Sequence, residues 1–317
     1  MAKASKTSKT ETPRADVYER ITAKVVEQME QGVRPWMQPW GNGTSPCRPL
    51  RHNGIRYQGI NTLLLWMEAA EKGYNSAYWM TYKQAQELGG QVVKGSKSAL
   101  VVYAGAIEKE QETPSGETVE TRIPFMKGYS VFNADQIENL PEHYYFMPEK
   151  NTEPKQRIAQ AEAFFANLKA DVREGGNQAY YSPVTDHIQM PPFDSFVSAE
   201  AHAAILAHEF THWTSAKNRL DRDLSRYHRD KEDRAREELI AELGSVFLAA
   251  DLGIEITPRE DHAAYLQSWL NVLKNDKRAI FQAASHAERA VTFMHGLQPN
   301  AHRGDDNLDQ LLEQEAA

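Results

Sequence analysis

Apolar residues recur at two different spacings along the chain, and the change of spacing separates expected helices from expected strands. A four-residue repeat of apolar side chains predicts a helix over residues 16–31, ended by Gly32. The repeat consists of Val17, Ile21, Val25 and Met29. Two more helices are predicted in the first third of the chain, one over residues 62–72 capped by Asn61 and one opened by the capping box Thr81–Gln84.

The pattern then changes to segments rich in Val, Tyr and Phe. Residues 91–94, 99–107 and 118–132 have this composition, which is typical of strands. The Thr-Pro-Ser-Gly turn at residues 113–116 separates the last two segments, so we expect a long antiparallel hairpin. Helices followed by a hairpin predict an α+β first domain over residues 15–146.

The second half of the chain is predominantly helical in pattern. Residues 156–172 predict an amphipathic helix, and two short strands are expected around residues 179–181 and 187–190. Four helices follow, at about residues 198–215, 230–251, 260–275 and 278–295. We therefore expect a mainly helical second domain with a small sheet over residues 156–298, with the domain boundary within residues 146–155.

Composition places the chain among ordinary globular proteins. It has 317 residues, 41% of them hydrophobic and 25% charged, and this length suggests two domains. The single cysteine, Cys47, excludes a disulfide framework and any site built from several cysteines. No apolar run reaches the about 18 residues of a membrane span, and residues 1–14 lack the apolar segment of a secretory signal. We expect a cytoplasmic protein with no membrane partner.

Charge is distributed unevenly along the chain, although the net charge is only −8. Residues 1–107 hold 14 Lys or Arg against 8 Asp or Glu, residues 108–150 hold 4 against 9, and residues 151–317 hold 18 against 27. The basic first third predicts that this part of the chain meets a polyanion and that the acidic second half does not.

The strongest chemical signal is the pentapeptide His-Glu-Phe-Thr-His at residues 208–212. Positions i and i+4 lie on one face of a helix, so both imidazoles can reach one cation. Glu209 then lies beside them, where its carboxylate can take a proton from an attacking water. Ser198 is a good N-cap for this helix, and the absence of Gly and Pro up to Ala216 favours a regular helix. The alternative is an exposed turn with two unrelated histidines.

The next predicted helix contains the candidates for a third ligand. Glu238 and Glu242 lie one turn apart beside an apolar stripe, which is unfavourable unless a cation or an imidazole lies between them. We assign Glu238 to the metal and Glu242 to orienting a ligand histidine through its other ring nitrogen. Other ligands remain open, namely His202, His228, His262 and His286. The donor set suits Zn best, and Mn or Co could occupy it.

Aromatic and basic residues cluster together in the first domain. A groove for single-stranded DNA needs planar side chains beside Lys or Arg, because unstacked bases and phosphates lie next to one another. The candidate residues are Trp36, Trp40, Arg51, Arg56, Tyr57, Trp79, Tyr82, Lys83, Lys94 and Lys97. The alternative is that most of these rings belong to the hydrophobic core, as we expect for Trp66.

Two runs in the second half carry a family resemblance. They are His208-Glu-Phe-Thr-His-Trp-Thr214 with the later Arg219-Leu220, and Glu237-Glu-Leu-Ile-Ala-Glu-Leu-Gly244 with the later Leu252-Gly-Ile254. These runs resemble the zincin-like metallopeptidase domain of the ArdC family of antirestriction proteins. The resemblance implies that the third ligand is the first glutamate of a Glu-x-x-x-(Glu/Asp/Asn) turn, which matches Glu238 and leaves Glu242 in a supporting role. Glu237 remains a fallback.

Motifs in the first half resemble the N-terminal domain of the same family, and the two resemblances together cover roughly residues 15–298. These motifs are Trp36-Met-Gln-Pro-Trp40, Tyr57-Gln-Gly-Ile-Asn61, Trp79-Met-Thr-Tyr-Lys-Gln-Ala85, Gly95-Ser-Lys97 and Tyr129-Ser-Val-Phe-Asn-Ala-Asp-Gln136. That domain is associated with binding single-stranded DNA. The resemblance implies a plasmid-encoded protein that protects incoming conjugative DNA from host restriction. The alternative is a zinc-dependent metallopeptidase that cleaves a host protein and uses DNA only for localisation.

Overall fold

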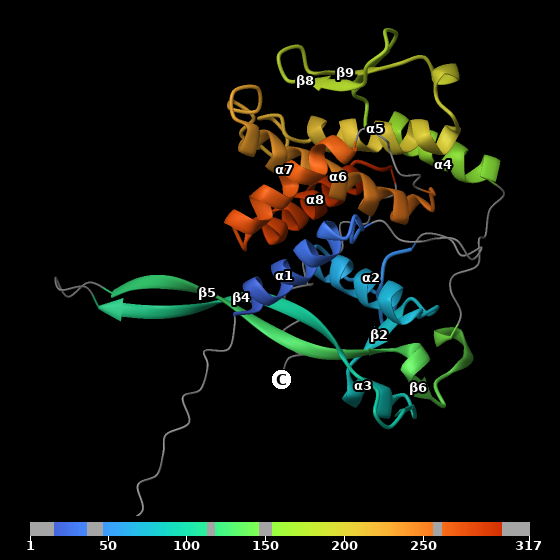
Figure 1. Ribbon diagram of the computed structural model, residues 1–317, viewed down its shortest axis with the longest axis vertical. Coiled ribbons are helices and arrows are strands. Elements are labelled where there is room, and N and C mark those ends of the chain that lie inside the picture. The colour runs from blue at the N-terminus through green and yellow to red at the C-terminus, as the bar shows by residue number, and fades with distance from the viewer. Residues whose placement is uncertain (1–15, 37–46, 113–117, 146–153, 256–261, 300–317) are drawn as a thin grey trace, which may run out of the picture.

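The computed structural model describes residues 16–36, 47–112, 118–145, 154–255 and 262–299. We call residues 16–145 the N-terminal lobe and residues 154–299 the C-terminal lobe. Figure 1 shows the helices α1 (Val17–Glu30) and α2 (Ile60–Lys72) of the N-terminal lobe between its hairpin and the helices of the C-terminal lobe. The expected boundary within residues 146–155 lies largely outside the described residues and stays a prediction.

A four-stranded sheet forms the body of the N-terminal lobe. Its order is β1 (Leu50–Arg51), β2 (Tyr78–Met80), β5 (Thr118–Asn133) and β4 (Ala99–Glu112). Strands β4 and β5 pair antiparallel, from Ala99 opposite Val131 to Glu112 opposite Thr118, so the predicted hairpin is confirmed. The helix α3 (Tyr82–Glu87) begins at the predicted capping box, in which the Thr81 hydroxyl accepts from the backbone N–H of Gln84.

Short elements complete the N-terminal lobe. Strands β3 (Gln91–Val92) and β6 (Ile137–Glu138) form a separate antiparallel pair. Two 3-10 helices, η1 (Ala134–Gln136) and η2 (Glu142–Tyr144), flank β6.

The C-terminal lobe is a helical layer with a small sheet above it (Figure 1). The sheet has the order β7 (Asp171–Glu174), β9 (His187–Met190) and β8 (Tyr180–Ser182). The helices are α4 (Pro154–Asn167), α5 (Ala199–Trp213), α6 (Lys231–Leu252), α7 (His262–Asn275) and α8 (Ala279–Gly296), with the 3-10 helix η3 (Phe193–Ser195) before α5. Helix α6 is buried over most of its length because α5, α7 and α8 all pack on it. The predicted α+β class and two-part layout are confirmed.

One hydrophobic core joins the two lobes. Met29, Trp36 and Trp66 from the N-terminal lobe belong to the same buried cluster as Phe247 and Trp269 from the C-terminal lobe. The Trp66 ring lies against Phe247, with centroids 6.0 Å apart, so its expected structural role is confirmed. The lobes therefore share packing surface that neither would bury alone.

A buried ionic cluster adds to this contact. The Arg48 guanidinium, which is almost fully buried, contacts Asp251 on α6 and Glu288 on α8 at distances of 3.0 and 2.6 Å. A buried charge is tolerated only where it is paired, so this contact fixes how the N-terminal lobe lies on the C-terminal helices.

Two expectations about elements are wrong. Asn61 does not cap α2, because the helix already begins at Ile60. The Asn61 side-chain amide instead forms hydrogen bonds with the backbone N–H and C=O of Val102, both at 2.8 Å. The helix expected to reach residue 172 ends at Asn167, because the chain reverses at Lys169 (φ 53°) and continues as β7 beside β9. No helix in the described parts of the chain combines the length and apolarity needed to span a bilayer.

Candidate metal centre and nucleic-acid surface

The helices α5 and α6 bring the candidate metal ligands together. Ser198 caps α5, its hydroxyl accepting from the Ala201 N–H at 3.1 Å, as the sequence predicts. Gly244 lets α6 approach closely, because a Cβ at that position would lie 2.5 Å from the Thr211 Cγ2 on α5. A side chain there would force the two helices apart, so the site depends on this glycine.

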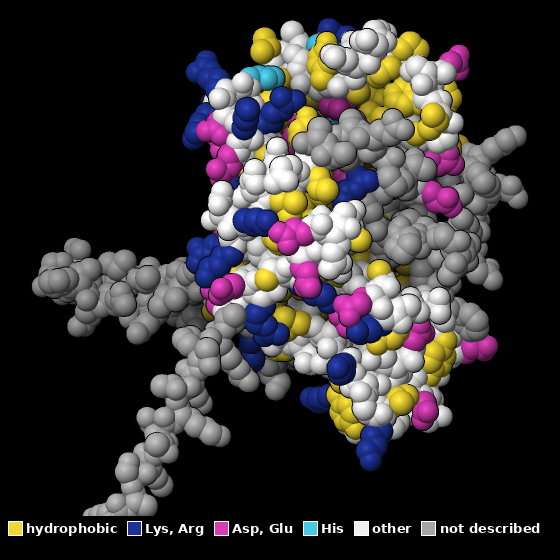
Figure 2. Space-filling model, in the orientation of Figure 1, with side chains coloured by type: hydrophobic (Ala, Val, Ile, Leu, Met, Phe, Trp, Pro, Cys, Tyr) yellow, Lys and Arg dark blue, Asp and Glu magenta, His cyan; other side chains and the backbone are white. Residues whose placement is uncertain are grey.

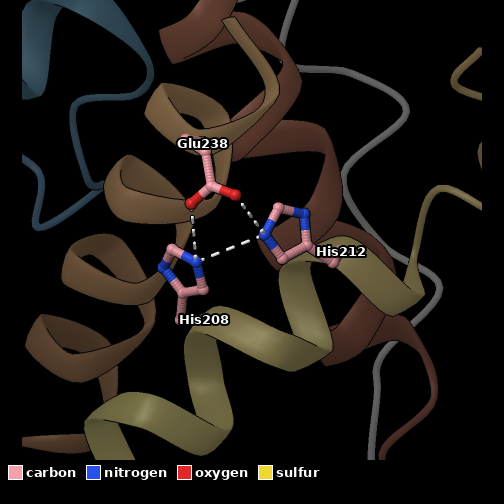
Figure 3. A group of neighbouring side chains, drawn as sticks. All are labelled: His208, His212 and Glu238. Atoms are coloured by element: carbon pink, nitrogen blue, oxygen red, sulfur yellow. Dashed lines mark hydrogen bonds and ion pairs between the residues drawn. The ribbon is translucent and has the colours of Figure 1, made fainter. Parts of the chain in front are cut away.

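His208, His212 and Glu238 point toward one another from these two helices (Figure 3). The two Nε2 atoms lie 3.2 Å apart, and the Glu238 carboxylate lies 3.5 Å from His208 Nε2 and 3.9 Å from His212 Nε2. All three side chains are buried. In the described parts of the chain, no other group of His, Cys, Asp or Glu side chains meets within such distances.

These distances fit a divalent cation. In a tetrahedral site with metal–nitrogen distances of about 2.0–2.1 Å, two nitrogens lie about 3.3 Å apart. The His208–His212 separation is close to that value, and the Glu238 oxygens lie only slightly farther away. Two imidazole nitrogens facing each other beside a carboxylate also need a proton or a cation between them, because their lone pairs repel.

Glu237, and not Glu242, contacts the outer ring nitrogen of a candidate ligand histidine. The Nδ1–H of His212 donates to Glu237 Oε1 at 3.0 Å, and the Arg222 guanidinium donates to both oxygens of Glu237 at 2.9 and 3.2 Å. Glu242, the residue expected in this role, instead accepts from the indole N–H of Trp36 at 3.2 Å. Glu237 takes the supporting role because it is one helical position from Glu238, on the side that faces His212.

Electrostatics favour charged groups in this cluster. Burial lowers the pKa of His212, but the hydrogen bond to Glu237 and the charge of Glu238 outweigh it and raise that pKa to about 9. Burial raises the pKa of Glu238, but the nearby imidazoles and the Tyr227 hydroxyl lower it to about 2. Burial and the Glu238 charge raise the pKa of Tyr227, so this phenol stays protonated and donates to Glu238 Oε1. Without a metal, the His212 imidazole is therefore in its protonated, positively charged form at neutral pH.

A cleft of about 850 Å³ opens over this cluster. Glu209, His208 and Glu238 line its floor, and strand β8 with the loop that precedes it lines one wall. Glu209 lies on α5 and is buried, and its carboxylate accepts no hydrogen bond from any described residue. A carboxylate in this position has its acceptor oxygens available to a molecule that enters the cleft.

Among the described side chains, none of the alternative histidines joins the His208, His212 and Glu238 cluster. The His202 ring packs edge-on against Phe193 and Phe196, with centroids 5.1 and 4.9 Å away. His228 is exposed beside Tyr227 and lines the same cleft, but it does not belong to the group of side chains that meet within ligand distance. His286 lies on α8, where it lines a different hollow. The side chain of His262 lies outside the described residues.

The aromatic candidates for DNA stacking are mostly buried. Trp36 is fully buried and contacts Trp269 with ring centroids 5.7 Å apart, and Tyr57 and Trp79 are also in the core. These three rings are buried in this conformation, Tyr57 at the edge of a hollow that Arg51 also lines, and their stacking role stays a prediction. The aromatic cluster in the sequence could not separate the two roles, because a hydrophobic core and a surface for base stacking use the same residue types. Trp40 lies outside the described residues.

The other candidates lie at the surface of the N-terminal lobe. Tyr82, Lys83, Lys94 and Lys97 are exposed. Arg56 is half-exposed and pairs with Asp251 at 3.0 Å. Arg51 stacks on Tyr57, with its guanidinium 5.3 Å from the ring centroid.

Sequence reasoning missed several residues around the metal cluster. Arg222 and Tyr227 come from the loop between α5 and α6, and Arg34 and Trp36 come from the segment that follows α1. None has a recognisable spacing to the histidines. The one available signal for Glu237 was its position beside Glu238 in a helix rich in carboxylates.

Comparison with known proteins identifies the family to which this chain belongs. A model of the N-terminal domain of anti-restriction factor ArdC matches residues 15–132, and a zincin-like metallopeptidase model matches residues 159–286. The metal-free crystal structure of antirestriction ArdC from plasmid R388 is 47% identical and superposes with a TM-score of 0.77, covering 91% of this chain and 100% of that one. The chain belongs to the ArdC family. The Mn(II)-bound structure of the same ArdC is 45% identical at the same coverage, with a TM-score of 0.74.

Other relatives of this ArdC-family chain differ in length. The uncharacterized protein y4eC of Sinorhizobium fredii is 39% identical over 94% of this chain and 98% of its own length. Two DNA primases TraC of Escherichia coli are 35% and 34% identical over 87% of this chain. The chain spans only 27% and 20% of those primases, so the similarity covers a minor part of them.

Proposed function

We propose that this chain is a plasmid-encoded antirestriction protein that binds single-stranded DNA and shields incoming conjugative DNA in the recipient cytoplasm. The observation that carries the proposal is its similarity, over 91% of the chain, to the antirestriction protein ArdC of plasmid R388. The exposed lysines of the N-terminal lobe, Lys83, Lys94 and Lys97, support it because phosphate contacts dominate binding to single strands. We propose residues 15–146 and 156–298 as the two domains.

A transfer assay with charge variants tests this proposal. We expect the triple variant Lys83→Gln, Lys94→Gln and Lys97→Gln to bind single-stranded DNA more weakly and to protect a plasmid entering a restricting host less well. The control replaces three other exposed lysines with glutamine, namely Lys169, Lys217 and Lys231. Equal protection by both triple variants and the wild type would contradict the proposal.

The metal centre supports a second candidate function, a metallopeptidase acting on a host protein. We propose His208, His212 and Glu238 as ligands of a divalent ion, Zn²⁺ by donor preference, with Mn²⁺ or Co²⁺ as alternatives. The observation that favours hydrolysis is Glu209, whose carboxylate lines the cleft beside the three ligands. When bound, the ion would polarise a peptide carbonyl as a Lewis acid.

The residues of this chain account for the proton transfers of such a reaction. Glu209 would accept a proton from the attacking water as the oxygen bonds to the carbonyl carbon. The same carboxyl would return that proton to the amine nitrogen as the C–N bond breaks. Glu237 would keep the His212 ring in place, and the outer edge of β8 would offer backbone N–H and C=O groups to an extended peptide.

One substitution separates the two candidate functions. Glu209→Ala removes the proton acceptor and leaves the surface of the N-terminal lobe unchanged. We expect this variant to protect transferred DNA as well as the wild type, which would remove proteolysis from the protective mechanism. Loss of protection with intact DNA binding would instead make peptidase activity the essential function.

A further inference from the structure

Two hollows on the surface meet along strand β4. The larger, of about 1580 Å³, lies between the start of α2, the hairpin and helix α8. The smaller, of about 190 Å³, lies on the face of the N-terminal sheet. Both are lined by Gln58, Asn61, Val102 and Ala104, so the two hollows adjoin at the outer edge of β4. Taken together, they make a groove that reaches from the N-terminal lobe to α8 in the C-terminal lobe. We call it the inter-lobe groove.

Two cationic groups at helix α8 line this groove without a carboxylate partner. Arg278 precedes the helix and Arg289 lies within it, and neither guanidinium forms an ion pair with a described carboxylate. They are eleven residues apart, which places them on nearly the same helix face with about 16 Å of axial rise between them. They lie in a C-terminal segment whose net charge is negative, since residues 151–317 hold 27 acidic and 18 basic side chains.

The carboxylates in the lining do not oppose this charge. Asp251 is paired with Arg48, Arg56 and His295, and Glu288 is paired with Arg48 and accepts from the Gly59 N–H. Their negative charges are therefore compensated within the protein. Arg278 and Arg289 therefore add positive charge to the groove, although Asp276 offsets part of the Arg278 charge. Figure 2 shows Lys and Arg side chains, with Asp and Glu side chains between them, on the side of the molecule where β4 and β5 lie.

Partly exposed rings lie along the same groove. Tyr103 and Tyr129 line its narrow end, where the Lys127 ammonium lies 5.1 Å from the centre of the Tyr129 ring. Phe125 and Phe293 line its wide end. Rings beside cationic groups suit single-stranded nucleic acids, because a base can stack on a flat side chain and a phosphate is attracted to a positive one. An acidic peptide would use the cations and leave these rings without a partner.

We propose that single-stranded nucleic acid lies along the inter-lobe groove, with bases against the rings near β4 and β5 and phosphates on Arg278 and Arg289 at α8. The C-terminal lobe thereby forms part of the nucleic-acid site. This inference rests on the proposed single-strand binding and assigns its path. It differs from the expectation, drawn from net charge alone, that only the first third of the chain meets the polyanion.

Fluorescence anisotropy with a labelled oligothymidylate of about 20 nucleotides tests the path, since a binding site of this kind covers about 4–16 nucleotides. The test variant is Arg278→Gln with Arg289→Gln in the full chain. The matched control is Arg229→Gln with Lys231→Gln, which removes the same charge from exposed positions before and at the start of α6. We expect the test variant to bind about tenfold or more weakly and to have a salt slope lower by about 0.7 for each phosphate that it no longer neutralises.

Three outcomes distinguish the claims. A test variant that binds within twofold of the control overturns the proposed path and leaves single-strand binding intact. A wild-type chain that does not bind the oligonucleotide overturns the proposed function itself. If the test variant melts at a lower temperature than the control, photo-crosslinking of the oligonucleotide to the wild type tests the path instead. Adducts on residues 278–293 would support the proposed path, and adducts confined to residues 78–97 would contradict it.

Discussion

Neighbouring carboxylates in the metal cluster have different partners, and this difference determines what each can do. Glu238 faces the two histidine Nε2 atoms, whereas Glu237 contacts the far nitrogen of His212 and the Arg222 guanidinium. The pKa of Glu237 lies below its ordinary value although burial raises it, because His212 and Arg222 stabilise the carboxylate. A charged Glu237 fixes the His212 ring with Nε2 directed at the ligand cluster.

Replacing Glu237 tests this role directly. We expect Glu237→Gln to lower the affinity for Zn²⁺ or Mn²⁺ about 10- to 100-fold, because the amide is a weaker partner for the His212 Nδ1–H. Competition with a chromophoric chelator measures the affinity. The control is Glu162→Gln on α4, an exposed position that should bind metal like the wild type. Equal affinity in both variants would exclude an orienting role for Glu237.

The raised pKa of His212 predicts how metal stabilisation varies with pH. In the metal-free protein the protonated ring contributes stability in full below about pH 6.5, and this contribution disappears as pH rises through about 9. Metal must displace that proton, so its affinity rises over the same interval. We expect the difference in melting temperature between metal-loaded and chelator-treated protein to widen from about pH 6.5 to about 9. A constant difference would show that His212 does not titrate in this range.

At the scale of elements, the contact between α5 and α6 determines the geometry of the cluster. Thr211 is fully buried against Gly244, and the candidate ligands lie on either side of this contact, at residues 208, 212 and 238. A small outward shift of α6 would move Glu238 away from both histidines. The packing of this helix pair and the metal geometry are therefore coupled.

Adding one methyl group at this contact tests the coupling. We expect Gly244→Ala to cost about 1–3 kcal/mol in free energy of unfolding, since the new Cβ overlaps Thr211, and to weaken metal binding as well. Chemical denaturation and chelator competition measure the two effects. Gly296→Ala, at the open end of α8, is the control and should be neutral or slightly stabilising. Unchanged metal affinity in Gly244→Ala would show that the cluster tolerates a shift of α6.

The elements most accurately predicted were those with local signals. The caps at Ser198 and Thr81 and the hairpin were predictable because their determinants lie within a few residues of each other. Asn61 was misassigned because its partner, Val102, lies 41 residues away. The strand β7 was missed because its exposed residues carry no alternating pattern. The contact of Glu237 with His212, across two helices, has no signature in the spacing of either.

At the scale of the whole molecule, the lobes are joined more closely than the charge pattern suggested. The basic first third and the acidic second half suggested two parts with different partners, whereas Ile21, Val25, Met29 and Trp36 are buried in a core shared with the C-terminal helices. A fragment ending near Glu149 would expose this surface. We expect that fragment to aggregate or to unfold without a cooperative transition in circular dichroism, and a cooperative melt would contradict the shared core.

The buried ionic cluster between the lobes provides a second test at this scale. We expect Arg48→Ala to cost about 3–5 kcal/mol in free energy of unfolding, because Asp251 and Glu288 are deprived of a buried partner. Arg56→Ala is the matched control: its half-exposed side chain contacts the same Asp251, which keeps Arg48 as a buried partner, so we expect a smaller cost. Equal effects of the two substitutions in urea denaturation would contradict the buried role of Arg48.

We propose that His208, His212 and Glu238 hold one divalent ion beside Glu209. A crystal structure of the protein with bound Zn²⁺ or Mn²⁺, with anomalous data collected at the metal edge, would locate the ion. We expect one strong anomalous peak within bonding distance of His208 Nε2, His212 Nε2 and a Glu238 oxygen, at about 2.0–2.2 Å for Zn²⁺. A peak bonded to His202, His228 or Glu242 instead, or no peak at this cluster, would contradict it.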